Sequence, residues 1–425
     1  MMKLTNEEQR MLNGEMGAFK QKALEKIIDY ANVLGADELC EVKKSTVYFG
    51  AHPYLDVLGT EDYDEIFSTM MLCSDTVYEL EDFSHDCFSQ TCAAGCDFYK
   101  YKSLNMDENL FNRNRSYLSD TSKKGVSVAG SCTPYLTGWI PLSGEHFTTT
   151  ESSNVIMANS IFGAYGNADG LEASAWSAIC GRTPKWGLHV KENRYANCIF
   201  EIDCPSETEK DWDIIGYVMG KKLPPQGQPV ISRGFKQPDI VKLKQCFASL
   251  ATTSGCEICH IVGITPEAPD LETALGNNTN CEVYKITEED YNEAIEFLSN
   301  KEGGSLELVS LGCPHYSLEE IRDTVEILNG RKIDKNVSVW LWTDISTQAM
   351  SDASGYTEIL QDAGIEIFNS SCPMVMGRGC LDGIKSIAFD GAKQAHYLQS
   401  EIDAKVFYGS RKECLEAAIN GRWGE

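Results

Sequence analysis

Apolar residues recur at helical spacing near the start of the chain and predict a helix over residues 4–35. Thr5 followed by Glu8 fits a capping box, in which each side chain binds the backbone N–H of the other residue. Residues 40–52 predict a strand that leads into a loop. Glycine-rich turns then separate short strands and helices through the middle of the chain, without internal repeats or long linkers. The pattern indicates a mixed α/β protein.

The C-terminal third shows the clearest alternation of strands and helices. Short apolar runs predict strands at 305–311, 337–343, 366–371 and 404–410. Amphipathic spacing predicts helices at 317–330, at 357–365 and after residue 410. The first of these helices begins at Ser317 with Glu320 at its third position, and it closes at Gly330. This order predicts a parallel sheet covered by helices. Cys313 and Cys372 each follow a strand, at the edge where open α/β sheets bind ligands.

Length and charge narrow the class of protein. The 425 residues are too many for one simple core, so we expect two to three α/β subdomains, the last at about 300–425. Mean hydropathy is −0.27, and no apolar run approaches the ~20 residues that span a bilayer. The first residues are polar and lack a signal-peptide pattern. The net charge of −26 disfavours nucleic acid and anionic lipid. We therefore expect a cytoplasmic protein without nucleic-acid or membrane partners.

The 17 cysteines, an odd number in a long chain, argue against a disulfide scaffold. Three of them are followed closely by proline, which stiffens the turn that orients the sulfur: Cys132, Cys313 and Cys372. Thiolates from such distant turns can converge on one iron site. Three protein ligands would leave one position open for chemistry. Cys204 also precedes a proline, but we interpret that pair as part of a polar loop.

Other motifs permit both a chemical and a structural interpretation. Residues 256–260 match the C-x-x-C-H pattern of haem attachment, yet we interpret them as a buried strand that runs into a loop. Cys87, Cys92 and Cys96 could bind zinc or nothing, and no fourth ligand is obvious. Residues 151–167 begin with a group of polar side chains. These could hold a small substrate, or they could cap the start of a helix. Four histidines lie in loop-like contexts, and each could take part in acid–base chemistry or have a structural role: His52, His189, His260 and His315.

Eight segments make the chain resemble the large subunit of aconitase X, a branch of the aconitase superfamily. In order they are LTNEEQRMLNGEMG, AHPYLD, SCTPY, ESSNVIMANSIFGA, GRTPKWGLHVKENR, HIVGITPEA, SLGCPHYSLEE and NSSCPMV. They run along nearly the whole chain. GCPHYS and GITPEA form the most specific pair, and the common order of all eight strengthens the resemblance.

The resemblance implies an aconitase-like fold of α/β/α subdomains with parallel sheets around a central active-site cleft. It also implies a hydro-lyase that removes water from a small 3-hydroxy acid. The family's metal ligands fall on Cys132, Cys313 and Cys372, which would hold a 2Fe–2S cluster, a 4Fe–4S cluster or a mononuclear iron. The predicted catalytic residues are Ser153, Asn154 and His260. The predicted substrate-binding residues are Ser152, Ser153, Asn154, Asn159 and His52.

The resemblance also implies a partner chain. In this family a separate small subunit, the swivelling domain, completes the active site and supplies a catalytic serine, so we expect no complete acid–base pair in this chain. Two substrates compete: cis-3-hydroxy-L-proline, dehydrated to a pyrroline-2-carboxylate, and mevalonate 5-phosphate. A phosphate site should show clustered Lys and Arg or a glycine-rich loop at a helix N-terminus. The sequence shows no strong one, which favours hydroxyproline.

The chain departs from the family pattern at two places. Tyr165-Gly166-Asn167 stands where the family tends to carry Arg-Thr, and Asp390-Gly391-Ala392-Lys393 stands where it often reads Ser-x-Lys. Both lie where substrate anions could bind, and loss of an arginine should weaken such binding. The first departure supports a different class of function, a noncatalytic iron-binding homologue. The three intact cysteines favour the enzyme.

Overall fold

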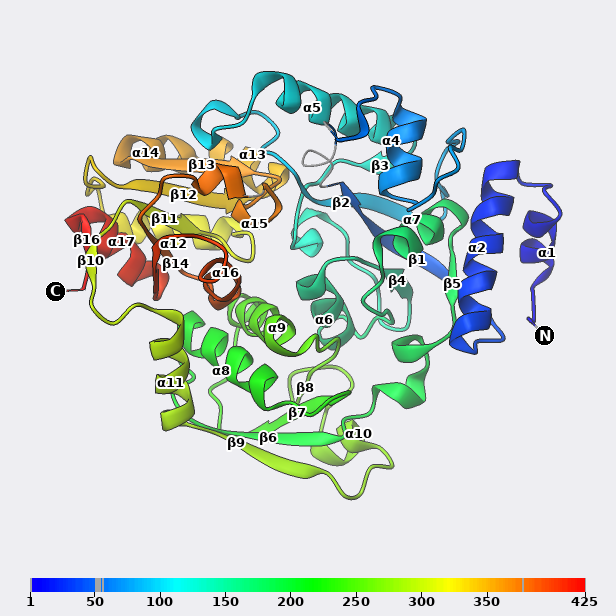
Figure 1. The fold of residues 1–425 in the computed structure, drawn as a ribbon. Helices are drawn as coiled ribbons and strands as arrows, with labels where there is room; N and C mark the ends of the chain where they lie inside the picture. The colour runs from blue at the N-terminus through cyan, green and yellow to red at the C-terminus, as the bar shows by residue number, and fades with distance from the viewer. Residues whose placement is uncertain (1, 50–54, 56, 377, 425) are drawn as a thin grey trace.

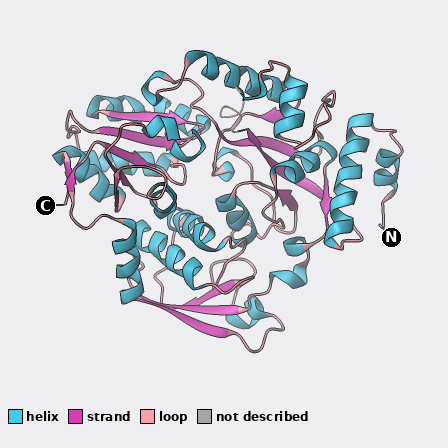
Figure 2. Ribbon diagram, viewed as in Figure 1, coloured by secondary structure: helices cyan, strands magenta, loops and turns pink. Residues whose placement is uncertain are grey.

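The computed structural model describes residues 2–49, 55, 57–376 and 378–424. Three sheets, each covered by helices, surround the middle of the molecule, where α6 and α16 both pack against α9 (Figures 1 and 2). This arrangement confirms the predicted α/β fold with parallel sheets. Within the described chain, no helix is both long enough and apolar enough to span a bilayer.

The first sheet is built from the N-terminal part of the chain. Its strand order is β3-β2-β1-β4 with parallel neighbours, and β5 pairs with β1 in the antiparallel sense. The strands are β1 (Leu39–Phe49), β2 (Phe88–Ala94), β3 (Val126–Ser127), β4 (His146–Thr148) and β5 (Arg182–Pro184). The helices are α1 (Asn6–Leu12), α2 (Ala18–Leu34), α4 (Tyr63–Met70), α5 (Glu108–Lys123), α6 (Ser152–Ser160) and α7 (Leu171–Cys180). Short 3-10 turns are η1 (Lys102–Leu104), η2 (Pro134–Thr137), η3 (Gly187–His189) and η4 (Lys191–Arg194).

The helix predicted over residues 4–35 forms as two helices. The capping box of Thr5 and Glu8 is present at the start of α1. Gly14 and Gly17 have φ angles of 80° and 99°, a region that a helix does not use and that glycine adopts at little cost. These two glycines therefore end α1 and separate it from α2, a break that apolar spacing alone did not reveal.

The second sheet is wholly parallel, with strand order β8-β7-β6-β9. Its strands are β6 (Cys198–Asp203), β7 (Pro229–Arg233), β8 (His260–Ile261) and β9 (Glu282–Thr287). Its helices are α8 (Glu209–Lys222), α9 (Ile240–Ser254), α10 (Leu271–Leu275) and α11 (Glu288–Leu298). The prediction of a strand over 256–260 was wrong, because only the final histidine is in a strand; Cys256 instead donates its thiol to the carbonyl of Ile258 within a loop.

The third sheet is also wholly parallel, with strand order β13-β12-β11-β14-β15. Its strands are β11 (Leu308–Leu311), β12 (Ser338–Thr343), β13 (Ile365–Asn369), β14 (Ser386–Phe389) and β15 (Lys405–Tyr408). Around it lie α12 (Leu318–Leu328), α13 (Ile345–Ala353), α14 (Tyr356–Ala363), α15 (Pro373–Met376), η5 (Arg378–Leu381), α16 (Ala392–Leu398) and α17 (Arg411–Asn420). A small antiparallel pair joins β10 (Gly304–Ser305) to β16 (Arg422–Trp423).

The capping box predicted for Ser317 and Glu320 is present at the start of α12. The helix ends one residue earlier than predicted, because Asn329 rather than Gly330 is the cap and adopts the left-handed conformation. Asparagine tolerates this conformation better than most residues.

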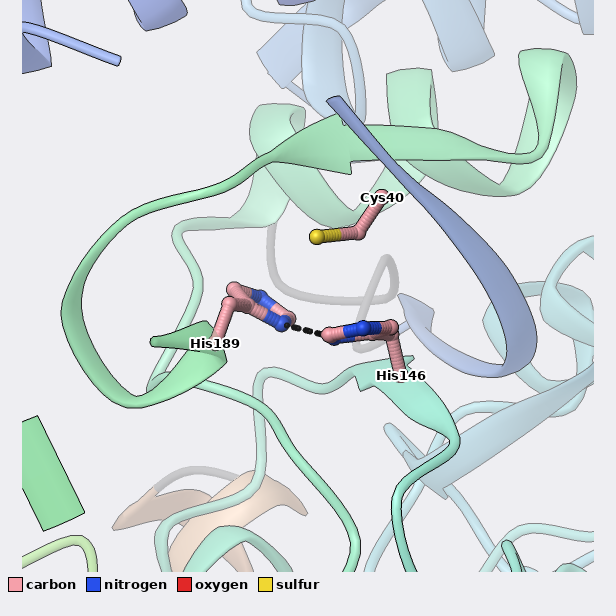
Figure 3. A group of neighbouring side chains, drawn as sticks. All are labelled: Cys40, His146 and His189. Carbon is pink, nitrogen blue, oxygen red and sulfur yellow. Dashed lines mark hydrogen bonds between the residues drawn. The ribbon is translucent and has the colours of Figure 1, made fainter. Parts of the chain in front are cut away.

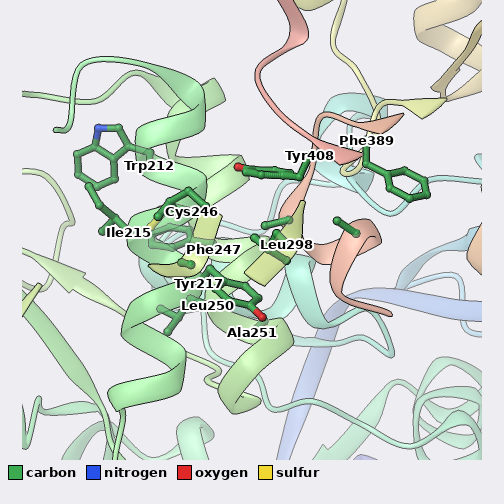
Figure 4. Close-up of a cluster of buried hydrophobic side chains, with 14 of the residues drawn as sticks. Trp212, Ile215, Tyr217, Cys246, Phe247, Leu250, Ala251, Leu298, Phe389 and Tyr408 are labelled. Atoms are coloured by element: carbon green, nitrogen blue, oxygen red, sulfur yellow. The ribbon is translucent and has the colours of Figure 1, made fainter. Parts of the chain in front are cut away.

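One buried apolar cluster joins the second and third sheets. Trp212 and Tyr217 of α8 and Phe247 of α9 belong to the same cluster as Phe389 of β14 and Tyr408 of β15 (Figure 4). Each of these side chains is at most 2% exposed. Because burial of a large apolar side chain stabilises by about 1.5–3 kcal/mol, this shared core holds the two sheets in a fixed relation.

Candidate functional site

The three cysteines followed by proline come together between the first and third sheets. Cys132 lies just before η2, Cys313 follows β11 by two residues, and Cys372 immediately precedes α15. In addition to burial, the Cys372 and Cys132 sulfurs both raise the pKa of Cys313, and Cys372 also raises that of Cys132, which places the three sulfurs near one another. All 17 cysteines, including these, are free thiols. The structure thus brings Cys132 next to the Cys313 loop at the carboxyl edge of the third sheet. The role of the three cysteines as metal ligands stays a prediction.

Two glycines permit the close approach of the loops. A Cβ on Gly130 would lie 2.4 Å from Cβ of Ser370, and a Cβ on Gly391 would lie 2.1 Å from the carbonyl oxygen of Cys313. Neither distance is compatible with a side chain. In addition, the backbone N–H of Ala94 in β2 donates to the carbonyl of Ser370 at 2.5 Å. Backbone packing thus holds the cysteine loops against each other.

His315 connects two of the cysteine loops. Its backbone N–H donates to Cys132 Sγ at 3.3 Å, and its Nε2 is 2.8 Å from the carbonyl oxygen of Ser371. A carbonyl only accepts, so Nε2 carries the proton and Nδ1 carries the lone pair. Nδ1 is buried without a hydrogen-bond partner. Burial also lowers the pKa of His315, which keeps the ring neutral.

An ion pair lies beside the three thiols. Lys393 Nζ, on α16, is 3.2 Å from Glu151 Oε1 and 3.0 Å from Ser152 Oγ. Burial alone would lower the pKa of Lys393, but the carboxylate of Glu151 opposes it, and the pKa lies above its usual value. Lys393 is therefore a fixed cation and no general base. Ser153 Oγ lies 3.2 Å from both Glu151 Oε1 and the carbonyl oxygen of Cys132.

A network of buried charged side chains holds the loop that contains Cys313. Lys244 Nζ donates to the carbonyl of His315 at 2.8 Å and pairs with Glu320 at 2.5 Å. Asp390 accepts the backbone N–H of Gly312 at 3.1 Å and the hydroxyl of Tyr316. Each of these charges has a partner, as buried charges require. The network fixes both sides of the turn that contains Cys313.

The predicted substrate residues divide between two places. Ser152 and Ser153, at the start of α6, contact the Lys393–Glu151 pair. Asn154 lies deeper: its Nδ2 donates to Thr149 at 3.1 Å, while its Oδ1 is buried without a partner. His52 lies outside the described residues.

Asn159 and His260 lie around Arg194. Asn159 Oδ1 accepts from Arg194 Nη1 at 2.9 Å, and its Nδ2 donates to the carbonyls of Gly166 and Glu257. His260 Nε2 donates to the carbonyl of Arg194 at 2.7 Å, and burial lowers the pKa of this histidine. A cavity of about 420 Å³ opens beside His260 and Arg194. The hydrogen bonds of Asn159 are thus used within the protein, and its role at a substrate, like that of His260, stays a prediction.

Comparison with known protein families gives matches along most of the chain. Family models for the first, second and third domains of aconitase X match residues 1–192, 196–296 and 306–420. The chain belongs to the aconitase X family. The matched segments cover all three sheets, so the resemblance seen in the eight sequence motifs is confirmed.

Curated and solved relatives agree with this assignment. The phosphomevalonate dehydratase large subunit of Methanocaldococcus jannaschii is 30% identical over 98% of this chain and 100% of its own length. The cis-3-hydroxy-L-proline dehydratase of Pseudomonas aeruginosa is 29% identical over 72% of this chain and 53% of its own length. The crystal structure of Thermococcus kodakaraensis aconitase X in its holo-form is 27% identical, with a TM-score of 0.82 over 98% of this chain and 100% of that one. These aconitase X relatives confirm an enzyme of the hydro-lyase class.

The two departures from the aconitase X pattern fall at different places. Asp390 and Lys393 lie beside the three cysteines, as described above. Tyr165 instead packs beneath Arg194, whose guanidinium carbon is 4.1 Å from the ring centroid. The departure at Asp390–Lys393 therefore concerns the cysteine site, and the departure at Tyr165–Asn167 concerns the Arg194 cluster.

The predicted set of site residues omitted three groups at the cysteines: Glu151, His315 and Lys393. Two signals were available. His315 follows Cys313-Pro314 directly, and Lys393 lies in the segment that the aconitase X pattern often writes as Ser-x-Lys. Glu151 gave only a weak signal, because it was one of several polar residues before α6.

Proposed function

We propose that this chain is the large subunit of a two-subunit dehydratase that removes water from cis-3-hydroxy-L-proline. The observation that supports this substrate is the Lys393–Glu151 ion pair beside the three cysteines. The reaction class follows from the aconitase X relatives. The proposal also includes the identity of the substrate, the presence of an iron centre and the presence of a partner chain.

The cysteine set fits an iron–sulfur cluster. Its three donors are all sulfur, the donor that such clusters take. Backbone N–H groups of His315, Met374 and Val375 donate toward the Cys132 and Cys372 sulfurs, and such bonds stabilise thiolates. Without a metal, burial raises the pKa of Cys132 to about 12 and raises those of Cys313 and Cys372. The site therefore holds neutral thiols until a cation replaces their protons.

The spacing of the sulfurs favours a cluster over a single iron. Three ligands on one tetrahedral ion at 2.3 Å lie about 3.8 Å apart. Among the described residues, three ligand atoms from Cys, His, Asp or Glu that all lie within 4.8 Å of one another are found at Cys40, His146 and His189. Cys132, Cys313 and Cys372 do not form such a set among the described residues, which suits separate irons of one cluster better than a single ion. When bound, the cluster supplies a Lewis acid for the leaving hydroxyl.

The charges beside the cysteines suit a zwitterion. Hydroxyproline carries one carboxylate and one ring ammonium at neutral pH. Lys393 provides a fixed cation for the carboxylate, and Glu151, 3.2 Å away, provides an anion for the ammonium. The Ser152 and Ser153 hydroxyls, which already contact this pair, can donate to the substrate oxygens.

The second candidate substrate is mevalonate 5-phosphate. The observation that favours it is the match over its whole length to a phosphomevalonate dehydratase large subunit. This substrate carries a carboxylate and a phosphate but no cation. It would place two anions near Glu151, and like charges at close range oppose binding. We therefore place hydroxyproline first.

A general base is still needed to take the proton beside the carboxylate. Lys393 is protonated and cannot serve. The relatives named as large subunits support a small subunit that brings the base, as the family resemblance implies. The large chain would then bind and orient the substrate, while the partner would complete the proton transfer.

The test uses the large chain purified without oxygen and combined with a small aconitase X subunit. We expect the pair, and neither chain alone, to convert cis-3-hydroxy-L-proline to a pyrroline carboxylate. Glu151→Gln should raise KM for hydroxyproline more than it lowers kcat, since the carboxylate binds the ammonium of the ground state. Turnover of mevalonate 5-phosphate alone would reverse the substrate assignment. Iron binding without any turnover would support a noncatalytic homologue.

A further inference from the structure

Cys40, His146 and His189 converge on one point of the first sheet, away from the three cysteines discussed above. Cys40 lies in β1, His146 begins β4, and His189 ends η3 (Figure 3). Their ligand atoms, one from each residue, all lie within 4.8 Å of one another. Spacing along the chain does not indicate this group, because Cys40 and His146 are more than a hundred positions apart and His146 and His189 are more than forty apart.

The geometry of the group matches a tetrahedral metal ion. The Nδ1 atoms of His146 and His189 face each other at 3.0 Å. Two imidazole nitrogens bound 2.0–2.1 Å from a tetrahedral ion lie about 3.3 Å apart. A shift of a few tenths of an ångström would therefore open the histidine pair enough to admit an ion, and the Cys40 sulfur is directed toward the same space (Figure 3).

The protonation states also suit a metal. Burial lowers the pKa of His146 to about 4 and that of His189 to about 3, so both rings are neutral near pH 7 and can offer a lone pair. Burial raises the pKa of Cys40 to about 12, so the thiol is protonated until an ion binds. Binding would then release the thiol proton, as metal binding to cysteine does.

Two nearby cations are already neutralised. Lys185 pairs with Glu38 at 2.8 Å, and Arg194 pairs with Glu267 through three contacts of 2.5–3.0 Å. Each cation therefore faces an anion, although Glu38 also pairs with Lys3. The nearby anion reduces the repulsion between each cation and an incoming ion. The thiolate of Cys40 would lower the net charge of the metal site by one unit.

We propose that Cys40, His146 and His189 bind a divalent transition-metal ion of the zinc type, separate from the iron centre. One thiolate and two imidazoles are ligands that Zn²⁺ prefers, whereas Mg²⁺ and Ca²⁺ take oxygen. The ion would join β1, β4 and η3, three segments that lie far apart in the chain and that no disulfide links. His146 is partly exposed, so water can fill the fourth position. The ion would stabilise the first sheet, from which the chain leads directly to Glu151 and Ser152.

The test measures metal binding by the full chain with its iron centre loaded. Wild type and variants are dialysed against Zn²⁺ under a competing chelator, and metal per chain is counted by mass spectrometry. We expect Cys40→Ser and His189→Asn to bind one zinc fewer than wild type. Cys87→Ser, which removes another buried cysteine near the first sheet, and His85→Asn, which removes an exposed histidine, should retain the wild-type count.

Cobalt provides a second measurement. Co²⁺ should give thiolate charge-transfer and tetrahedral ligand-field absorption in wild type, and the charge-transfer part should vanish in Cys40→Ser. If Cys40→Ser does not fold, His146→Asn decides the question, since this partly exposed ring can be replaced with little disturbance. Equal zinc counts in wild type, His146→Asn and His189→Asn would overturn the proposal, and so would cobalt spectra without any thiolate contribution.

Discussion

The backbone N–H of His315 donates to Cys132 Sγ at 3.3 Å, although the two residues are 183 positions apart in the chain. The same histidine holds the carbonyl of Ser371 through its Nε2. One residue thus connects the turns of all three cysteines: it follows Cys313 by two positions, binds Cys132, and contacts the residue before Cys372. A change in the position of any one turn should therefore shift the other two.

Replacement of a single cysteine should abolish the iron centre. We expect anaerobically purified Cys313→Ser to lose most of its iron and sulfide, because the loss of one thiolate from three leaves too few ligands. Iron analysis and visible absorbance provide the measurement. Cys204→Ser is the matched control, since Cys204 also precedes a proline but lies in a polar loop; its iron content should equal that of wild type. Iron loss in both variants would contradict the assignment.

Lys393 should matter for rate as well as for binding. Lys393→Met removes a fixed cation from a largely buried site, and we expect kcat/KM to fall by about 10²–10³-fold, as for other lost electrostatic groups. Lys393→Arg keeps the charge and should recover part of this loss. The measurement is steady-state kinetics of the two-subunit enzyme on hydroxyproline. An unchanged kcat/KM in Lys393→Met would show that the substrate binds elsewhere.

The close contact at Gly391 should not tolerate a side chain. Gly391→Ala would place a Cβ 2.1 Å from the Cys313 carbonyl oxygen, and relief of this clash should lower the free energy of unfolding by about 1–3 kcal/mol. Iron binding should weaken with it, because the turn of Cys313 must move. Gly379→Ala is the control: its Cβ would meet no atom within 4 Å. Equal denaturation midpoints for the two variants would refute the argument.

Acid should destabilise the first sheet through its buried histidines. The pKa of His189 is about 3 in the folded chain, below the ordinary value of about 6.5. The unfolded chain therefore binds more protons between these values, and the free energy of unfolding should fall as pH drops below about 6.5, by at most roughly 1.4 kcal/mol per pH unit. His189→Asn should flatten this dependence.

This dependence can be measured by urea unfolding at a series of pH values in the presence of a metal chelator. His85→Asn, at an exposed histidine, should follow the wild-type curve. A slope that is the same in wild type and His189→Asn would show that the buried ring does not control acid stability.

The sequence predicted local structure well where signals are short-range. Capping boxes at Thr5 and Ser317 are present, because each depends on residues three positions apart. The positions of Cys313 and Cys372 after strands followed from apolar runs of ordinary length. By contrast, β14 and α16 were not predicted, although β14, with four residues, is no shorter than β11 and β15, which were.

Contacts between distant segments could not be predicted from spacing. Glu151 meets Lys393 across 242 positions, and no local pattern announces such a pair. The same is true of the Cys40 group, whose members become neighbours only when β1, β4 and η3 assemble. For the three cysteines the family resemblance provided what spacing could not. The identity of the substrate depends on side chains of this long-range kind, which is why the sequence left two candidates.

The strand order of the third sheet has a consequence for how the protein is made. All three cysteines have been synthesised once residue 372 leaves the ribosome, but β14 and β15, which complete the sheet beside β11, follow later, as does Lys393. Until then the carboxyl end of β11 lacks its neighbour on one side, and the Cys313 turn lacks Asp390 and Gly391. A growing chain thus presents its thiols before their surroundings exist. We therefore expect the proposed iron centre to be loaded on the finished chain, after translation has ended.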